Sequence, residues 1–147
     1  MQFKLLGEGA GQRIFVVILA PEEAVVATLT RFVQKRDLTA ASVTAIGAFR
    51  RTTLGFFDLE RQDYHRIELD EQWEVLSWLG DCALGEEGSP ILHLHVVLGM
   101  RNGEAKGGHL IEALVRPTLE VMIKENTSTM VRTYRPEFGI ALIDPRK

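Results

Sequence analysis

The sequence contains a single cysteine, Cys82, among its 147 residues. One thiol cannot form an internal disulfide, so no disulfide framework holds this chain together. Long apolar runs are also missing. The longest run near the start, residues 14–20, is far shorter than the roughly 20 residues of a membrane-spanning helix, and Pro21 ends it. No secretory signal pattern precedes that run. We therefore expect a cytoplasmic protein that has no membrane span.

Positive charge is scarce as well. Seventeen Lys and Arg residues face 20 Asp and Glu residues, so the formal net charge is −3 and the pI is near 5.8. Such a chain has no global attraction for nucleic acid or for an anionic membrane. DNA remains a possible partner, but we expect the domain alone to bind it weakly.

The chain also lacks internal repeats and low-complexity linkers. Hydrophobic residues make up 46% of the sequence and charged residues 25%, as in ordinary globular proteins, which excludes the disordered and fibrous classes. A length of 147 residues suits one domain with one core. We predict a single domain over residues 1–147.

Strand patterns dominate what is present. Apolar and β-branched runs between polar turns predict strands at residues 3–6, 14–19, 43–49, 53–57, 64–69, 73–79, 118–123, 130–134 and 140–143. Pro21 followed by two glutamates signals the start of a helix, and apolar spacing extends it to about Arg36. The sequence thus predicts an α+β fold, a mainly antiparallel β-sheet with one long helix packed against it.

Two predicted strands carry apolar residues on both faces. In residues 73–79 apolar side chains occupy both sides of the strand, which would leave Glu74 buried or half-buried, and residues 118–123 are similar. One helix covers only one face of a sheet, so the other face would expose a large apolar patch. Self-association closed by cyclic symmetry would bury that patch.

Three of the four histidines lie in residues 91–110, which read ILHLHVVLGMRNGEAKGGHL. Successive side chains of a strand point to opposite faces, so His93 and His95 share one face and the apolar residues between them share the other. This spacing alone gives half of a metal site.

The third histidine depends on the turn between the two strands. If Arg101-Asn102-Gly103 forms a three-residue loop with a left-handed glycine, the ladder places His95 directly opposite His109, and His93 lies on the diagonal. Opposed Cβ atoms are roughly 4.5–5.5 Å apart and diagonal ones about 7–8 Å. A two-residue loop would turn His109 to the other face, unless a bulge at the Gly-Gly pair before it restores the register.

Imidazoles from His93, His95 and His109 could then bind one ion at about 2.0–2.1 Å, and zinc is the metal we expect. Iron, nickel and copper also accept imidazole, and spacing does not choose among them. Three protein ligands leave a fourth position for water, a carboxylate or a small molecule, as in catalytic rather than closed structural zinc sites. The alternative is that solvent or local hydrogen bonds satisfy each histidine.

Several short blocks together carry a family resemblance. They are Gly47-Ala48-Phe49, Leu54-Gly55-Phe56-Phe57-Asp58, Tyr64, Glu74-Val75-Leu76-Ser77 with Gly80, His93-Leu94-His95-Val96-Val97-Leu98, Gly107-Gly108-His109-Leu110 and Thr118-Leu119-Glu120-Val121. The combination resembles the PPC domain, the "plants and prokaryotes conserved" family. The resemblance covers nearly the whole chain, and the separation of the two histidine blocks makes it specific.

The resemblance implies an α+β fold, a homotrimer and, as in some prokaryotic members, a metal at His93, His95 and His109. Plant members of the family accompany AT-hooks in nuclear DNA-binding proteins, whereas prokaryotic members are usually stand-alone candidate DNA-binding proteins. This sequence departs from the plant pattern because it contains no Arg-Gly-Arg-Pro segment.

Two function classes follow. One is a trimeric, metal-binding regulatory or interaction domain of the DNA-binding type, with its histidines near subunit boundaries. The other is a zinc-dependent enzyme in which the ion activates water and Glu74, Glu104 or Glu120 serves as general base for a small molecule that the sequence does not identify.

Overall fold

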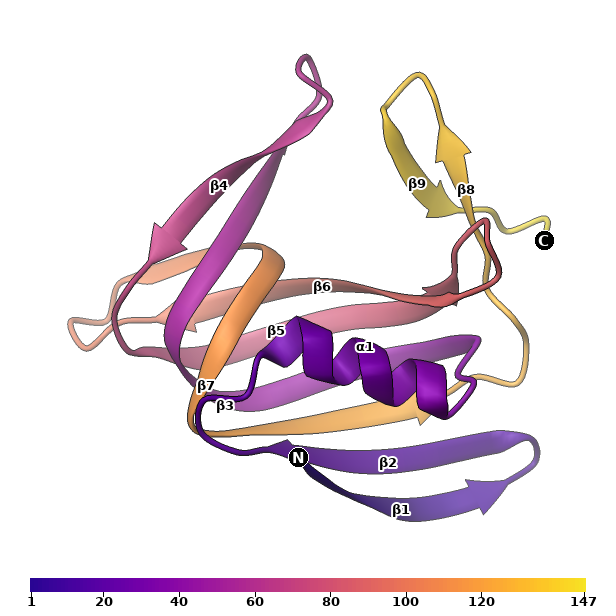
Figure 1. Ribbon diagram of the computed structural model, residues 1–147, viewed down its shortest axis with the longest axis horizontal. Coiled ribbons are helices and arrows are strands. Elements are labelled where there is room, and N and C mark those ends of the chain that lie inside the picture. The colour runs from indigo at the N-terminus through magenta and orange to yellow at the C-terminus, as the bar shows by residue number, and fades with distance from the viewer.

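The computed structural model describes all 147 residues as a β-rich fold with one helix (Figure 1). The strands are β1 (Gln2–Gly9), β2 (Gln12–Leu19), β3 (Ala40–Asp58), β4 (Asp63–Leu69), β5 (Trp73–Leu84), β6 (Pro90–Gly99), β7 (Ala105–Glu125), β8 (Arg132–Arg135) and β9 (Ile140–Ile143), and the helix is α1 (Val25–Lys35). No helical segment combines the length and the apolarity that crossing a membrane requires.

Seven strands form one antiparallel sheet in the order β1-β2-β7-β6-β5-β3-β4, and β7 pairs with β3 as well. The first part of β7 lies between β6 and the second half of β3, whereas its last part lies between the first half of β3 and β2. These double pairings roll the sheet around one core. The predicted antiparallel α+β fold is confirmed, and the last two strands form the separate β8–β9 hairpin.

Two strands are longer than the sequence indicated. Residues 43–49 and 53–57 belong to one strand, β3, with Arg50 and Arg51 in its middle rather than between two separate strands. Similarly, β7 continues through Pro117. Its pairing with β3 shifts register between Gly47 and Phe49, so the proline, which has no N–H to donate, lies at an irregularity and leaves the ladder on both sides intact.

The helix is short, and the prediction of a long helix beginning at Pro21 was wrong. Glu22 adopts a left-handed backbone conformation with φ of 67°, and its N–H donates to the carbonyl of Val115 in β7. This segment is therefore tied to the sheet as a turn, and α1 begins only at Val25. Glu112 of β7 accepts hydrogen bonds from the first free N–H groups of the helix, at Val26 (2.8 Å) and Ala27 (3.3 Å).

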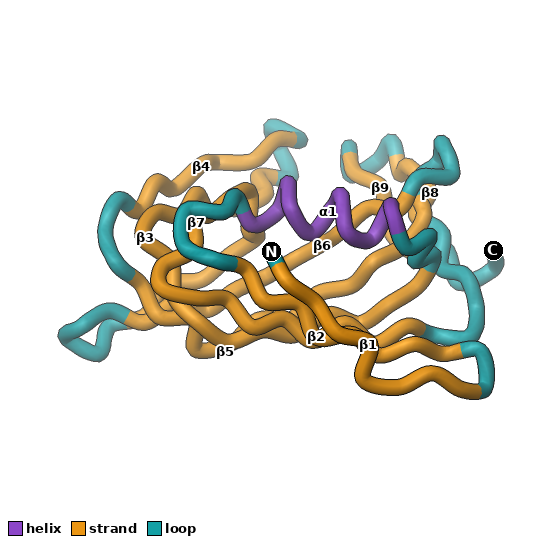
Figure 2. The backbone as a smooth tube through the Cα atoms, turned by 60° about the horizontal axis from the view of Figure 1, so that its bottom comes forward, coloured by secondary structure: helices purple, strands orange, loops and turns teal.

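The core lies between α1 and the face of the sheet that α1 covers (Figure 2). Val25, Leu29, Phe32 and Val33 of the helix are buried there, as their helical spacing predicted. Figure 2 shows the helix on one side of the strands, so the outward face of the sheet has no helix over it.

Strand β5 shows how the two faces differ. A register irregularity between Val75 and Ser77 changes the alternation, so Trp73, Val75 and Trp78 all point into the core. The prediction that Glu74 is buried was wrong, because it lies on the exposed side. The outward side keeps large apolar residues exposed, namely Ile46, Leu76, Leu79, Val97 and Met122.

Candidate metal centre

The β6–β7 hairpin has the register that the sequence predicted. Met100 N–H donates to the carbonyl of Glu104 at 2.8 Å, and Gly103 has a φ of 86°, so the loop is the expected three-residue turn with a left-handed glycine. His95 consequently lies directly opposite His109 in the ladder.

The three predicted histidines converge on the outward face of the sheet. Their ligand atoms all lie within 4.8 Å of one another. The Nε2 atoms of His93 and His95 are 3.1 Å apart. The ring centroids are separated by 5.0 Å for His93 and His95, 5.1 Å for His93 and His109, and 5.5 Å for His95 and His109. No other group of histidine, cysteine and acidic side chains in the chain meets this test.

Tyr64 of β4 covers one side of the cluster. Its ring stacks on His109 with centroids 4.8 Å apart and planes inclined by 23°. Gly55 makes room for this contact, since a Cβ atom at that position would lie 2.7 Å from the Tyr64 ring. The stacked tyrosine helps to fix the orientation of the His109 ring.

Asp81 and Arg132 lie on the other side. Asp81 of β5 is directly opposite His93 in the ladder. Arg132, which comes from the start of β8, donates from Nη2 to Asp81 Oδ1 at 2.5 Å. Figure 1 shows β4 and the β8–β9 hairpin rising at opposite ends of the sheet, with β6 running between their bases. The centre is therefore flanked by side chains from both projections.

The environment holds two of the three imidazoles neutral. Burial, together with the neighbouring His93, His95 and Arg132, lowers the pKa of His109 to about 4. Burial also lowers the pKa of His93, again with help from Arg132 and His95, although Asp81 opposes the shift. Neutral imidazole is the form that binds a metal ion.

The residues fit a transition-metal ion. Two nitrogens bound at about 2.0–2.1 Å with a tetrahedral angle are roughly 3.3 Å apart, close to the His93–His95 separation of 3.1 Å. The Nδ1 atom of His109 is buried and has no hydrogen-bond partner. A buried polar atom without a partner costs free energy, so this orphaned nitrogen is a second observation that favours a ligand at the cluster.

Comparison with known proteins agrees with this geometry. Residues 6–127 match the family described as the Plants and Prokaryotes Conserved (PCC) domain. The chain belongs to this family. The expected membership, drawn from the HLHVVL and GGHL blocks, is confirmed, and the histidine hairpin lies inside the matched region of this PPC domain.

Three solved structures are similar over almost the whole chain. A PPC protein of Pyrococcus horikoshii has 27% identity and a TM-score of 0.84, with 99% of this chain and 96% of that chain covered. A metal-containing protein of Archaeoglobus fulgidus has 30% identity and a TM-score of 0.81, covering 97% and 96%. A candidate DNA-binding protein of Bacteroides thetaiotaomicron has 23% identity, a TM-score of 0.86 and coverage of 99% of both chains, a likeness of fold. No curated protein matches the sequence.

None of the three glutamates considered as a general base reaches the centre of this PPC domain. Glu74 lies opposite Gly99, four residues along β6 from His95, and Glu104 lies at the hairpin loop. Glu120 pairs with Ile18 and Ile46 in another part of the sheet. At about 3.3 Å per residue, Glu74 is displaced by more than 10 Å along the strand. The expectation that one of them could act as base at the histidines was wrong.

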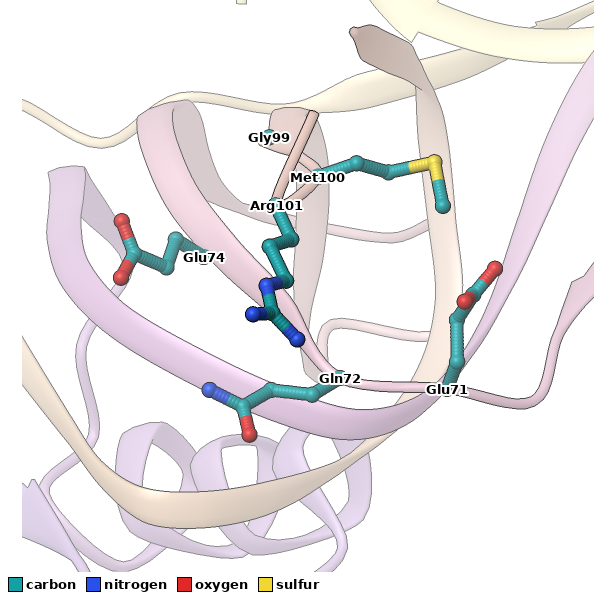
Figure 3. Close-up of a pocket in the computed structure, with 6 residues that line it drawn as sticks. All are labelled: Glu71, Gln72, Glu74, Gly99, Met100 and Arg101. Atoms are coloured by element: carbon teal, nitrogen blue, oxygen red, sulfur yellow. The ribbon is translucent and has the colours of Figure 1, made fainter. Parts of the chain in front are cut away.

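Glu74 instead lines a hollow of ≈ 510 Å³ at the end of the β5–β6 pair (Figure 3). Glu71, Gln72, Met100 and Arg101 line it as well. The carboxylates and the guanidinium drawn in Figure 3 belong to exposed loop and strand-end residues, and no histidine is among them. This hollow is separate from the metal centre.

The sequence reasoning assigned no role to Tyr64, Asp81 or Arg132. Asp81 follows the Trp73–Leu79 run and lies on the same face of the strand as Leu79. Its position opposite His93 could have been predicted only if the register of β5 with β6 had been known. Arg132 is 51 residues from Asp81, and no local pattern links them.

Proposed function

We propose that this PPC-domain protein is a metal-binding homotrimer in which His93, His95 and His109 hold one transition-metal ion, with zinc as the expected metal. The observation that carries the proposal is the convergence of three ligand atoms within 4.8 Å on a register-fixed hairpin. The lowered pKa values of His93 and His109 support it, because both rings stay available as ligands down to acidic pH. A similar protein of Archaeoglobus fulgidus is described as metal-containing.

When bound, an ion with three imidazole ligands keeps a position open for a further ligand and can act as a Lewis acid there. The chain supplies the rest of the environment. Tyr64 holds the His109 ring by stacking, and Arg132 keeps a positive charge next to His93. Asp81, the carboxylate opposite His93, is paired with Arg132 and so is not a free base.

The homotrimer is supported by the outward face of the sheet. Thr44 lies opposite both Leu79 and Met122, and Leu79 lies opposite His95, so this apolar face runs from β7 across β3 and β5 to the histidines on β6. Leu79 is 66% exposed and Met122 is 39% exposed. We propose that neighbouring copies bury this face, which would place the metal centre near a subunit boundary.

A role of the DNA-binding or regulatory type is proposed on family grounds. A protein of Bacteroides thetaiotaomicron with this fold and another of Ralstonia eutropha are described as candidate DNA-binding proteins. The charge of this chain gives the role little support by itself. Arg50, one of its two adjacent arginines, pairs with Glu22 at 3.1 Å. We therefore propose that a single chain binds DNA weakly. The trimer would bring the basic side chains of three chains together and so strengthen that binding.

The test is metal retention by His95→Ala, compared with His65→Ala, in protein purified without a histidine tag. His65 is the one histidine outside the cluster, on β4, and is the matched control. The proposal predicts that His95→Ala loses most of the metal while His65→Ala keeps it. Equal metal content in both variants would contradict the assignment.

A further inference from the structure

Arg132 is an unusual arginine because it is almost fully buried and only partly hydrogen-bonded. It is 6% exposed. Its side chain makes one hydrogen bond, from Nη2 to Asp81 Oδ1, and its Nε atom is buried without any partner. Burying a charged donor without a partner costs several times what an ordinary hydrogen bond contributes, so a retained one points to a ligand that completes it.

The position of this guanidinium is set by two contacts. Asp81 accepts its hydrogen bond. Asp81 is also the residue opposite His93 in the ladder, so the Cβ atoms of Asp81 and His93 are roughly 4.5–5.5 Å apart. Arg132 is also close enough to His93 and His109 for its charge to help lower the pKa of both, and it opposes the rise that burial causes in the pKa of Tyr64. The free Nε donor thus belongs to the same neighbourhood as the three imidazoles.

We propose that the metal centre binds a small oxyanion, a carboxylate or phosphate group, that takes the open position on the ion and accepts a hydrogen bond from Arg132. This inference rests on the proposed metal site and adds the class of ligand. Three neutral imidazoles do not offset the charge of a divalent ion, and Asp81 offsets only that of Arg132. The assembled centre is therefore cationic. An oxyanion supplies the charge, the metal ligand and the acceptor that Nε lacks.

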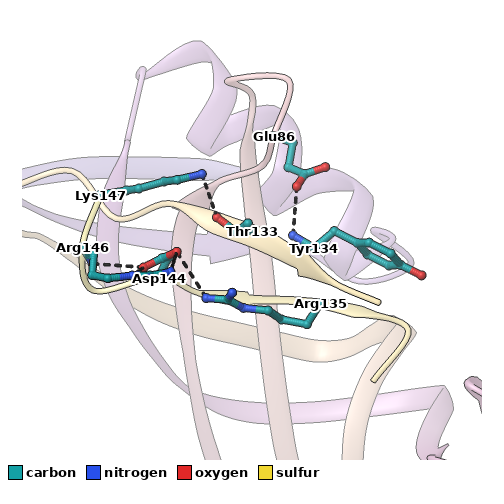
Figure 4. A network of polar contacts seen from close by, with 7 residues as sticks. All are labelled: Glu86, Thr133, Tyr134, Arg135, Asp144, Arg146 and Lys147. Carbon is teal, nitrogen blue, oxygen red and sulfur yellow. Dashed lines mark hydrogen bonds and ion pairs between the residues drawn. The ribbon is translucent and has the colours of Figure 1, made fainter. Parts of the chain in front are cut away.

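The other arginines of this region differ from Arg132. Arg135, on the same strand, donates to Asp144 at 3.2 Å, and Arg146 donates to both oxygens of Asp144 at 2.9 Å (Figure 4). Tyr134 N–H donates to Glu86 and Lys147 donates to Thr133, so Figure 4 shows a hairpin anchored by paired groups. Arg135 therefore serves as the control: substituting it shows what the loss of a structural arginine on β8 does by itself.

The experiment loads the purified full-length chain with cobalt(II) and measures its visible spectrum and titration heat with inorganic phosphate and, separately, with succinate. Wild type, Arg132→Gln, Arg132→Lys and Arg135→Gln are compared, each after its cobalt content has been measured. We expect equal cobalt uptake by all four. We also expect the oxyanion to bind Arg132→Gln at least about tenfold more weakly, the loss of one charged hydrogen bond, and Arg135→Gln as tightly as wild type.

The outcomes separate this inference from the metal site. Unchanged affinity in cobalt-loaded Arg132→Gln, or an equal loss in Arg135→Gln, would overturn the ligand assignment and leave the metal site standing. A wild-type chain that takes up no cobalt would overturn both. If Arg132→Gln does not fold, Arg132→Lys decides: weakening by about threefold or more supports the need for a guanidinium donor, and full wild-type affinity overturns it.

Discussion

His95 lies directly opposite His109 across the β6–β7 ladder, and a three-residue turn of Arg101, Asn102 and Gly103 fixes that relationship. Side chains alternate between faces, so a shift of one residue would send His109 to the helix-covered side of the sheet. The metal centre therefore depends on the length of a loop that contributes none of its ligands.

Deleting Asn102 tests this dependence. A two-residue loop pairs the strands in a register that removes His109 from the face of His93 and His95, so we expect the variant to lose most of its metal affinity, by about tenfold or more. Elemental analysis after dialysis against metal-free buffer gives the readout. Asn102→Ala is the control, because it keeps the loop length and removes only the hydrogen bond from Glu104 N–H to Asn102 Oδ1. A folded deletion variant with full metal content would contradict the register argument.

The stability of the metal-free protein should depend on pH through His109. Burial lowers the pKa of this ring to about 4 from the ordinary value of 6.5. Between these values the unfolded chain binds a proton that the folded chain does not, so the free energy of unfolding falls as pH falls from about 6.5 to about 4 and is fully retained above that window. Urea unfolding near pH 7 and near pH 5, at one protein concentration, measures the difference.

His109→Gln should reduce that pH dependence, since a glutamine does not titrate. His65→Gln, a change on the exposed strand β4, should leave it as in wild type. If His109→Gln has the same slope as wild type between pH 7 and pH 5, His109 is not the group responsible.

Assembly should depend on the outward apolar face. Leu79→Glu places a carboxylate where a neighbouring copy is proposed to pack, and it removes a leucine side chain whose full burial is worth roughly 1.5–3 kcal/mol. Size exclusion with light scattering should give wild type a mass near three times 16.5 kDa and the variant a smaller mass. Leu59→Glu, at a site that is 63% exposed in the β3–β4 turn, should stay trimeric. A folded, soluble wild-type monomer at micromolar concentration would refute the assembly.

Duplex DNA should bind weakly and without sequence preference. Few phosphates can be neutralised by a chain with a net charge of −3 whose Arg50 is already paired with Glu22. Fluorescence anisotropy over a salt series should show affinity that disappears near physiological salt. Nanomolar, sequence-specific binding under those conditions would show that the charge pattern was misjudged, and Arg50 and Arg51 would be the first positions to substitute.

Local rules were enough to predict the hairpin. The left-handed Gly103, the loop length and the two-residue period of His93 and His95 are all properties of adjacent residues, and together they determined the register. The mainly antiparallel sheet was predicted on the same basis, and the last two strands were predicted without their pairing as the β8–β9 hairpin.

Features that depend on distant contacts could not be predicted. The helix begins late because Glu22 bonds to Val115, far along the chain. Pro117 resembles a strand end, yet the irregularity opposite it in β3 lets β7 continue. The irregularity after Val75 turned Trp78 inward and left Glu74 exposed, and the ion pair of Arg132 with Asp81 joins residues that no sequence spacing relates.

The central claim is tested most directly by the metal content of the wild-type chain, purified without a histidine tag and without chelator. Elemental analysis should find about one equivalent of a transition metal per chain, with zinc the expected element, since three imidazoles at this spacing suit such an ion. A content below about a tenth of an equivalent, in protein that also takes up none when zinc is added, would contradict the assignment of His93, His95 and His109 as a metal centre.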